Sequence, residues 1–531
     1  MPPAAARTPP ASTTVLIAGA GPVGLAAAVE LGLRGVECTV VEPRATVSRS
    51  RPRAKTINVR TMEHLRRWGL ADRLRAAAPL PVAFSQDAVF CTSLSGRELS
   101  RFTGIFGMVA DGDRFAELGQ QAPQYVLEEL LRGVVGELDA CTLVTGYSVV
   151  DLDQSDDGVR VAVAGPDGSR GTVEASYVIG CDGARSAVRD AIGSAYVGEL
   201  AMRPNFGMVF RAPELWRHVR HGPAVHYWTV NREAPALMGP LDRDGTWWVI
   251  AFGVDREAGL RDPQRIVDGL AGVPVPATVL STDPWTARME LVDRARRGRV
   301  FLAGDAAHLN PPFGGHGFNT GLGDAVDLGW KLAAVLAGWG GPGLLDSYEA
   351  ERRPVQQKII DAAVANMRTL SGELVTDDLD DDGPAGEAAR RLAHERIQRT
   401  KAAEFHALDL VLDLGVRGSP VVAADTAPDG RPRAGDRLPH AWLPDGRSLY
   451  DVLGADHTLL VRGPGHGRAV RALTAGFAAR GVPLAVVDPT GLPSADGPGL
   501  LLVRPDQHIA WRGDAAPPDP AALAELVSGR A

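Results

Sequence analysis

Cysteine is scarce in this chain, with only four among 531 residues. Cys38, Cys91, Cys141 and Cys181 lie far apart in the sequence and form no Cys-x-x-Cys pair. Small disulfide scaffolds and structural zinc sites are built from closely spaced cysteines, so the sequence argues against both. We therefore expect reduced thiols, no metal centre and a cytoplasmic location.

Excess positive charge and long apolar runs are also missing. The 56 lysines and arginines are outnumbered by 64 acidic residues, for a net charge of −8, whereas nucleic-acid binding usually shows as a basic domain. No apolar run approaches the roughly 18 residues of a membrane span. Residues 1–13 are rich in Ala and Pro without an apolar core, so we expect a disordered tail rather than a secretory signal.

The first ordered segment predicts one βαβ unit. Thr14–Ala18 is short, apolar and β-branched, as a buried parallel strand should be. Pro22–Arg34 indicates a helix, and Val36–Glu42 indicates a second strand. Further buried strands are expected at Ser176–Gly180 and Arg299–Ala303, each ending in a turn that contains Gly and Asp.

A glycine-rich turn joins the first strand to the first helix, with the sequence Gly19-Ala20-Gly21-Pro22-Val23-Gly24. In such a turn the first glycine permits a tight bend, the second lets a pyrophosphate approach, and the third allows close helix–strand packing. Glu42 ends the second strand, where an acidic residue binds a ribose. The pattern predicts dinucleotide binding by Gly19, Gly21, Pro22, Val23, Gly24 and Glu42, without separating NAD from FAD.

Two further motifs follow in a fixed order. Val178–Arg189 contains Asp182-Gly183, and Arg299–His308 contains Gly304-Asp305. With these motifs the chain resembles the p-hydroxybenzoate hydroxylase family, the single-component (class A) flavoprotein aromatic hydroxylases. The resemblance implies bound FAD, with Asp182 supporting the cofactor region and Asp305, after Gly304, holding the ribityl chain.

The segment Pro311–Asp324 is rich in glycine and resembles the flavin loop of the same family. By that resemblance Gly315 and Gly317 let the backbone approach the flavin ring, and the amides of Phe318 and Asn319 bind its pyrimidine edge. Pro312 would lie beside the site of the oxygen reaction, and a helix is expected to start near Phe318.

Two more segments match the family. Arg51-Pro-Arg53 resembles its arginine-bearing segment, which contacts the cofactor, although Lys55 stands where relatives often carry a small residue. Gln124 matches a glutamine that contacts the ribityl chain. All these cofactor contacts are what the resemblance implies.

Residues 197–289 differ in texture and predict antiparallel strands spaced by turn residues, at Phe206–Arg211, Ala224–Val230, Pro235–Pro240 and Thr246–Phe252. Substrate contacts are expected from this sheet where it faces the flavin. The candidates are Phe210, His226, Trp228, Met238 and Trp248. His226, and His316 from the flavin loop, could hold a phenolic proton because histidine titrates near neutrality.

The expected fold is α/β (α+β overall), with a glutathione-reductase-like Rossmann domain, an inserted antiparallel substrate sheet and a C-terminal thioredoxin-like domain without Cys-x-x-Cys. Helices are expected from Asp324 through Leu336 and over Val355–Leu370. The domains are an FAD-binding domain from 14–80, 110–196 and 290–370, a substrate-binding domain from 81–109 and 197–289, a helical segment and linker over 371–430, and the thioredoxin-like domain over 431–531.

The resemblance implies a monooxygenase that hydroxylates an aromatic, phenolic or polyketide-like substrate with NADPH or NADH and O2, through a flavin C4a-hydroperoxide. The protein would be a monomer or homodimer whose partner is a small aromatic molecule, not a nucleic acid or a membrane. Baeyer–Villiger or decarboxylative oxygenation, a flavin oxidase and a non-catalytic flavin-binding module remain open. The adjacent Trp247 and Trp248 do not have the spacing of a flavin-dependent halogenase.

Overall fold

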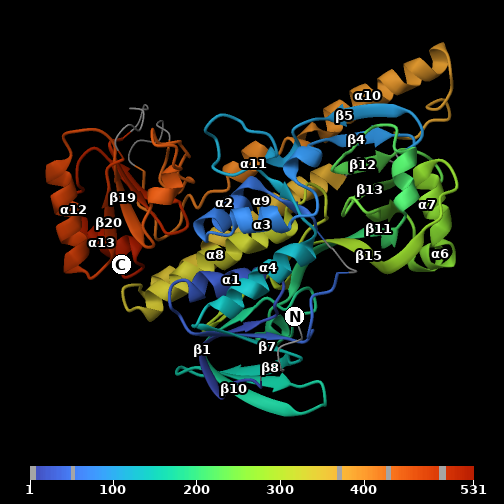
Figure 1. The fold of residues 1–531 in the computed structure, drawn as a ribbon. Coiled ribbons are helices and arrows are strands. Elements are labelled where there is room, and N and C mark those ends of the chain that lie inside the picture. Colours follow the sequence, from blue (N-terminus) through green and yellow to red (C-terminus); the bar gives the residue numbers. More distant parts are fainter. Residues whose placement is uncertain (1–7, 50–53, 368–373, 426–431, 490–497) are drawn as a thin grey trace.

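The structure, a computed structural model, describes residues 8–49, 54–367, 374–425, 432–489 and 498–531. Its three large sheets are arranged around a long central helix, α8 (Gly317–Leu336). Figure 1 shows α8 running from the junction of the first two sheets towards the C-terminal sheet. This arrangement matches the Rossmann, antiparallel and thioredoxin-like parts expected from the sequence.

The first sheet forms the Rossmann core. Its strands lie in the order β16 (Arg296–Arg297), β17 (Val300–Leu302), β10 (Arg170–Gly180), β1 (Ser12–Ala18), β2 (Cys38–Glu42) and β7 (Cys141–Thr145). All neighbours from β17 to β7 run parallel, and β1 and β2 are almost wholly buried, which is why they are continuous apolar runs. Helices α1 (Pro22–Gly32), α4 (Gln124–Glu137) and α8 cover one face (Figure 1).

Further helices and short strands surround this core. They are β3 (Thr56–Ile57) paired with β6 (Gln120–Gln121), α2 (Val59–Arg67), α3 (Ala71–Ala77), α5 (Ala187–Ala191) and α9 (Pro342–Met367). Helix α2 starts where it does because the Asn58 side chain accepts a hydrogen bond from the Thr61 N–H at 2.9 Å.

The second sheet is antiparallel except between β12 and β4. Its order is β18 (His308–Leu309), β15 (Thr278–Val292), β11 (Tyr196–Arg211), β14 (Thr246–Phe252), β13 (Ala236–Pro240), β12 (His226–Thr229), β4 (Ala88–Cys91) and β5 (Glu98–Phe102). Helices α6 (Arg256–Arg261) and α7 (Pro263–Ala271) lie beside it, and α10 (Pro384–Phe405) packs along β5. Helix α11 (Leu408–Leu412) follows.

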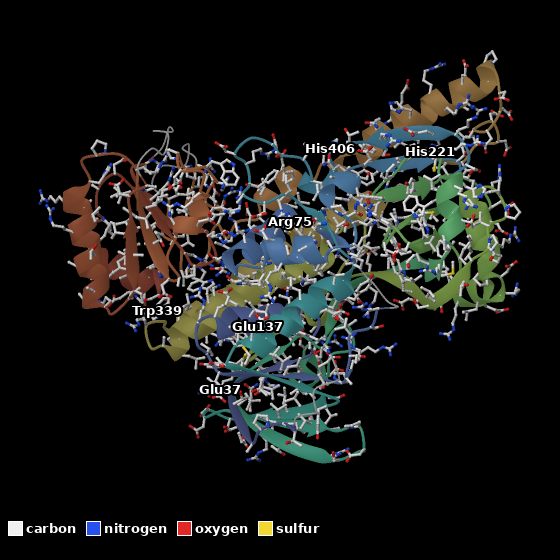
Figure 2. The ribbon with its side chains drawn as sticks, in the orientation of Figure 1. Glu37, Arg75, Glu137, His221, Trp339 and His406 are labelled. Atoms are coloured by element: carbon white, nitrogen blue, oxygen red, sulfur yellow. The ribbon has the colours of Figure 1, made fainter. Side chains whose placement is uncertain are left out.

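The third sheet has the order β20 (Leu484–Val487), β19 (His457–Val461), β21 (Leu500–Val503) and β22 (Ile509–Gly513), with α12 (Gly467–Ala479) and α13 (Pro520–Val527). Its apolar core is continuous with the end of α8. Trp339, labelled in Figure 2, lies just beyond α8, and its ring centroid is 5.5 Å from that of His457 on β19. The C-terminal domain therefore packs on the Rossmann domain through a shared core.

Several element boundaries differ from the sequence predictions. Strand β1 begins at Ser12, so Ser12 and Thr13 belong to the sheet and not to a tail; residues 1–7 lie outside the described residues. Helix α9 runs through Pro354 from Pro342, whereas the sequence placed its start after the proline; buried Glu351 and Arg352 anchor this part of the helix. The predicted helix end at Leu370 and the linker residues 427–431 also lie outside the described residues.

The sheet strands also extend beyond the expected boundaries. Strands β8 (Ser148–Gln154) and β9 (Val159–Ala164) form a hairpin continued by a long β10, a feature that the sequence analysis did not predict. Strand β11 begins at Tyr196, which pairs with Val292. The antiparallel sheet thus includes Tyr196, residues 290–292 and β18, which lie in stretches predicted to belong to the FAD-binding domain.

A buried ionic cluster joins the C-terminal domain to α8 and α9. The Arg504 guanidinium donates to Glu351 Oε1 at 2.7 Å, to Asp327 Oδ1 at 3.0 Å and to Asp506 Oδ2 at 2.6 Å. Lys331 Nζ contacts Asp327 at 2.9 Å and Glu351 at 2.7 Å. Burial alone would raise the pKa of Glu351, but Arg504 and Lys331 hold it well below its usual range. Each charge here depends on its neighbours, because no solvent reaches them.

Among the helices of the described residues, none combines the length and the apolar character needed to cross a bilayer.

We predict that Arg504→Met lowers the free energy of unfolding by about 3–5 kcal/mol, because removing one partner strands buried charges of the other sign. Arg447→Met is the control, since its side chain is 60% exposed and pairs only with Asp445; it should cost under about 1 kcal/mol. Urea unfolding followed by tryptophan fluorescence measures both. Equal stability of the two variants would show that the cluster does not hold the domains together.

Candidate active site

The glycine-rich turn after β1 is closely packed at two of its glycines and open at the third. Gly19 has φ +99°, and a Cβ there would lie 2.5 Å from the Cys181 carbonyl oxygen. A Cβ on Gly24 would lie 2.0 Å from the Gly19 oxygen, whereas a Cβ on Gly21 would meet nothing within 4 Å. Gly21 is the N-cap of α1 and no side chain caps the helix. The first-turn N–H groups therefore face an open space suited to a pyrophosphate.

Glu42 lies beside this turn, at the carboxyl end of β2. One carboxylate oxygen accepts from the Ala20 N–H at 2.8 Å, and the other from the N–H and Nε of Arg44 at 3.0 and 2.7 Å. The side chain is 2% exposed. The turn is thus tied to the acidic strand end, which is the geometry that binds the ribose of a dinucleotide.

The Asp182 carboxylate is used within its own turn. It accepts from the Ser186 hydroxyl and from the Val188 N–H at the start of α5, and burial raises its pKa. Because the preceding Cys181 carbonyl packs on Gly19, Asp182 supports the region of the first turn through the backbone.

The Gly304-Asp305 turn meets the first turn at a close contact. Gly304 has φ +60°, and a Cβ on it would lie 2.8 Å from Val23 Cγ2. A Cβ on Gly321 of α8 would lie 2.6 Å from the same methyl group. Asp305 is exposed, and its backbone oxygen accepts from the Tyr196 hydroxyl. Three motifs spread over about 280 residues of the chain therefore come together.

A buried carboxylate, Asp324, fixes this turn to α8 and α9. It accepts from the Gly304 N–H at 3.1 Å, His308 Nε2 at 3.0 Å, Arg352 Nε at 2.8 Å and Gln356 Nε2 at 3.1 Å. Burial would raise its pKa, yet Arg352 and His308 lower it to about 2. The sequence analysis gave Asp324 no role; the only signal was an acidic residue inside an apolar helix.

The glycine loop lies at the start of α8. The Gly315 N–H donates to the Pro312 oxygen at 3.1 Å, and Gly315 has φ +67°. The Asn319 side chain accepts from the Asn58 N–H at 3.1 Å and donates to the oxygens of Thr56 at 3.0 Å and Gly315 at 2.7 Å. The Asn319 side chain thus connects the loop to β3, a contact separate from the flavin binding predicted for its backbone N–H.

The remaining residues of the loop and its neighbours are placed as follows. Helix α8 begins at Gly317, one residue before the expected start, and Phe318 is half-buried against the Rossmann core. Gln124 is the first residue of α4; its N–H donates to the Ala54 oxygen at 2.8 Å, and its side chain donates to Glu128 at 2.6 Å. Arg51 and Arg53 lie outside the described residues.

The structure divides the five substrate candidates between two faces of the antiparallel sheet. The Trp228 ring stacks on Phe90, at 5.3 Å and 14°, and lies 6.0 Å from the ring of Phe313 in the glycine loop. The His226 ring lies 5.6 Å from that of Trp248. These three candidates therefore share the face towards the glycine loop.

Phe210 and Met238 lie on the opposite face. They are wholly buried with Trp247, Ile266 and neighbouring residues in a core shared with α7. Side chains alternate between the faces of a strand, so a difference of one position sends a residue to the other side. Phe210 and Met238 therefore face away from the glycine loop, and their contact with substrate stays a prediction.

Both candidate histidines are buried and neutral near pH 7. Burial lowers the pKa of His316 to about 4 and that of His226 well below its usual range. His316 Nε2 has no hydrogen-bond partner within the described part of the chain. At neutral pH each ring offers one hydrogen-bond donor and one acceptor, and neither supplies a positive charge.

Comparison with known proteins gives two matching family descriptions. The FAD binding domain matches residues 12–363, and the C-terminal domain of aromatic-ring hydroxylases matches residues 431–529. Aklavinone 12-hydroxylase RdmE of Streptomyces purpurascens is 32% identical, covering 97% of this chain and 98% of its own. The 2,4-dichlorophenol 6-monooxygenase of Delftia acidovorans is 30% identical, over 94% of each.

A solved structure is similar along the whole chain. The rebeccamycin biosynthetic enzyme RebC with reduced flavin superposes with a TM-score of 0.89 and is 36% identical, covering 99% of this chain and 100% of its own.

Two glycines of the first turn, Gly21 and Gly24, predict different effects of the same mutation. Gly21→Ala should leave the fold and thermal stability unchanged but raise the Kd for FAD by about tenfold or more, because the methyl group fills the space left for a pyrophosphate. Gly24→Ala should instead destabilise the protein itself, since its Cβ overlaps the Gly19 oxygen. Thermal melts of the FAD-free proteins and FAD titration measure both effects. If FAD binds Gly21→Ala as tightly as the wild type, the pyrophosphate does not lie there.

Proposed function

The chain belongs to the family of FAD-dependent aromatic-ring hydroxylases, and on that premise we propose that its substrate is a fused-ring phenol held on the glycine-loop face of the antiparallel sheet. The protein is an FAD-dependent monooxygenase that uses NAD(P)H and O2.

The observation that carries this proposal is the aromatic lining of that face. The Trp228 ring lies 5.3 to 6.0 Å, centroid to centroid, from the rings of Phe90, Phe252 and Phe313, and Phe252 lies 5.9 Å from Phe313. Broad aromatic surfaces favour stacking with a flat apolar ligand. A fused-ring substrate also agrees with the similarity to a protein named for aklavinone hydroxylation.

The residues already described would hold the cofactor in the following way. The open side of Gly21 and the N-terminus of α1 bind the pyrophosphate, Glu42 the ribose, and Asp305 and Gln124 the ribityl chain. The backbone at Gly315, Gly317, Phe318 and Asn319 lies against the flavin ring. FAD, when bound, accepts hydride from NAD(P)H and activates O2.

The protein residues then position the substrate, exclude water from it and hydrogen-bond to its hydroxyl groups. The aromatic lining excludes water from the reacting ring, which limits loss of activated oxygen as hydrogen peroxide. Pro312, in the glycine loop, would lie beside the site where oxygen reacts. Neutral His226 lies in the same lining, where its ring accepts a hydrogen bond from a substrate hydroxyl and stays uncharged. His316, held against Gly314, keeps the loop in place.

The curated relatives named above are a hydroxylase and a monooxygenase, which fits hydroxylation rather than the Baeyer–Villiger, decarboxylative or oxidase alternatives. A cytoplasmic location is favoured by the need for NAD(P)H and by free Cys38 and Cys141, whose sulfurs lie 3.4 Å apart as thiols. The protein is proposed to be a monomer or homodimer.

The test of this function is oxygen incorporation. Purified FAD-bound protein is given NADPH, 18O2 and a fused-ring phenol such as 1,8-dihydroxyanthraquinone or, separately, phenol. We expect faster NADPH oxidation with the fused-ring compound and a product that carries one 18O atom. Faster turnover of phenol would overturn the fused-ring proposal, and peroxide as the only product with either compound would replace monooxygenase by oxidase.

We predict that Gly315→Val releases more hydrogen peroxide for each NADPH consumed. Gly315 has φ +67°, and its Cβ would lie 3.3 Å from Thr56 Cβ, so a branched side chain displaces the loop from the flavin. Gly168→Val is the control, because Gly168 also has a left-handed φ, +80°, but lies in open space on a distant hairpin turn. Peroxide yields that rise equally in both variants would mean that general strain, and not the loop, causes the uncoupling.

A further inference from the structure

Lys55 is a buried amine between the Rossmann domain and the antiparallel sheet. It directly precedes β3, and its side chain is 6% exposed. Its Nζ donates to the Pro240 oxygen at the end of β13 at 2.9 Å, and to Gln121 Oε1 on β6 at 3.2 Å. The next residue, Thr56, contacts the glycine loop through Asn319. Lys55 therefore lies where the flavin loop and the substrate sheet meet.

This lysine has no counter-charge in the described part of the chain. No carboxylate pairs with its Nζ, and burial alone lowers its pKa to about 7. Its two protein acceptors are a carbonyl and an amide oxygen, which leave one of its three N–H groups unused. A buried ammonium group without an anion is costly, so a ligand that brings a negative charge would bind with a gain.

Two other buried N–H donors beside Lys55 have no acceptor among the described residues. They are Trp248 Nε1 and Gln121 Nε2. The orientation of the Gln121 amide is fixed, because its oxygen faces the Lys55 ammonium. Leaving a buried donor unpaired costs about 1–3 kcal/mol, so both groups call for an acceptor that the protein does not provide.

Lys55 and Trp248 come together beside Gly239 on β13. A Cβ on Gly239 would lie 2.5 Å from the Val225 carbonyl oxygen, 3.0 Å from Lys55 Nζ and 3.1 Å from Trp248 Nε1. The absence of a side chain at Gly239 therefore lets both donors approach the same stretch of backbone, which a larger residue would prevent. His226 borders the group through Trp248, and its neutral ring adds no competing charge.

We propose that Lys55, Gln121 and Trp248 form a binding site for an anionic oxygen of the substrate, a phenolate or a carboxylate carried on the polycyclic ring. This inference rests on the proposed function and adds the charge of the substrate to it. One edge of the ring system would lie at Gly239 with its oxygen on the three donors. The remainder would extend along the aromatic lining towards Trp228.

The experiment compares Lys55→Met with wild-type holoprotein in binding three anthraquinone probes. Anthraquinone-2-carboxylate presents a carboxylate oxygen and 1,2-dihydroxyanthraquinone a phenolate oxygen. Anthraquinone-2-carboxamide is the neutral control. Changes in flavin absorbance give each Kd. In Lys55→Met we expect the Kd of the carboxylate probe, of the dihydroxy probe or of both to rise about tenfold or more, the range for a charged hydrogen bond. The Kd of the amide should be unchanged. Trp248→Phe, which keeps a ring but removes the N–H, should have a smaller effect in the same direction.

The carboxylate probe also allows a pH test, because it stays ionised from pH 6 to 9. Its wild-type Kd should rise as the pH increases and Lys55 loses its proton, while in Lys55→Met the Kd should not vary. His226, the other titratable group here, stays neutral throughout because burial holds its pKa low. Lys358→Met is the control for loss of a lysine; its side chain is 46% exposed on α9.

Three results would overturn the proposal: an equal loss of affinity for charged and neutral probes, a wild type that prefers the amide or binds neither charged probe, or a Lys55→Met protein altered only in FAD affinity. Each leaves the proposed function standing if a fused-ring phenol still gives an 18O-labelled product in the wild type. Loss of that product would instead remove the function on which the inference rests.

Discussion

The carboxylate of Asp324 is the interaction on which the candidate active site depends most. It is wholly buried, and its oxygens accept hydrogen bonds from the Gly304 turn, from His308 and from Arg352 and Gln356 of α9. A buried carboxylate holds its donors firmly, because a donor that leaves it loses a charged hydrogen bond and gains no water. The glycine loop lies between His308 and Asp324 in the chain, so both of its ends are anchored at one point. The loop can therefore present its backbone to a flavin in a defined position.

Helix α8, which carries Asp324, also connects the Rossmann domain to the C-terminal domain. Asp327 lies further along α8 than Asp324 and pairs with Lys331 of the same helix and with Arg504 of the C-terminal domain, which also holds Asp506. The C-terminal domain contributes none of the proposed cofactor contacts, yet it covers the charged and aromatic end of the helix whose first turn forms part of the site. We infer that its contribution is to fix α8 in place.

The local motifs could be predicted from the sequence, and the relations between distant segments could not. The glycine turn and β14 depend on residues within a few positions of one another, so their patterns are readable in the chain. Which face of the sheet a side chain takes depends on strand register, so the sequence did not reveal that Phe210 and Met238 pack under α7. The site at Gly239 combines β3, β6, β13 and β14, and no local pattern connects Lys55 with Trp248.

The most direct test of the account is a crystal structure of the holoprotein with a fused-ring phenol. It should place the FAD pyrophosphate against Gly21, with the flavin ring along the backbone at Gly315. The phenol should lie on the face that carries Trp228, with an oxygen near Lys55. A ligand bound among Phe210 and the other residues under α7, or a pyrophosphate away from Gly21, would contradict it.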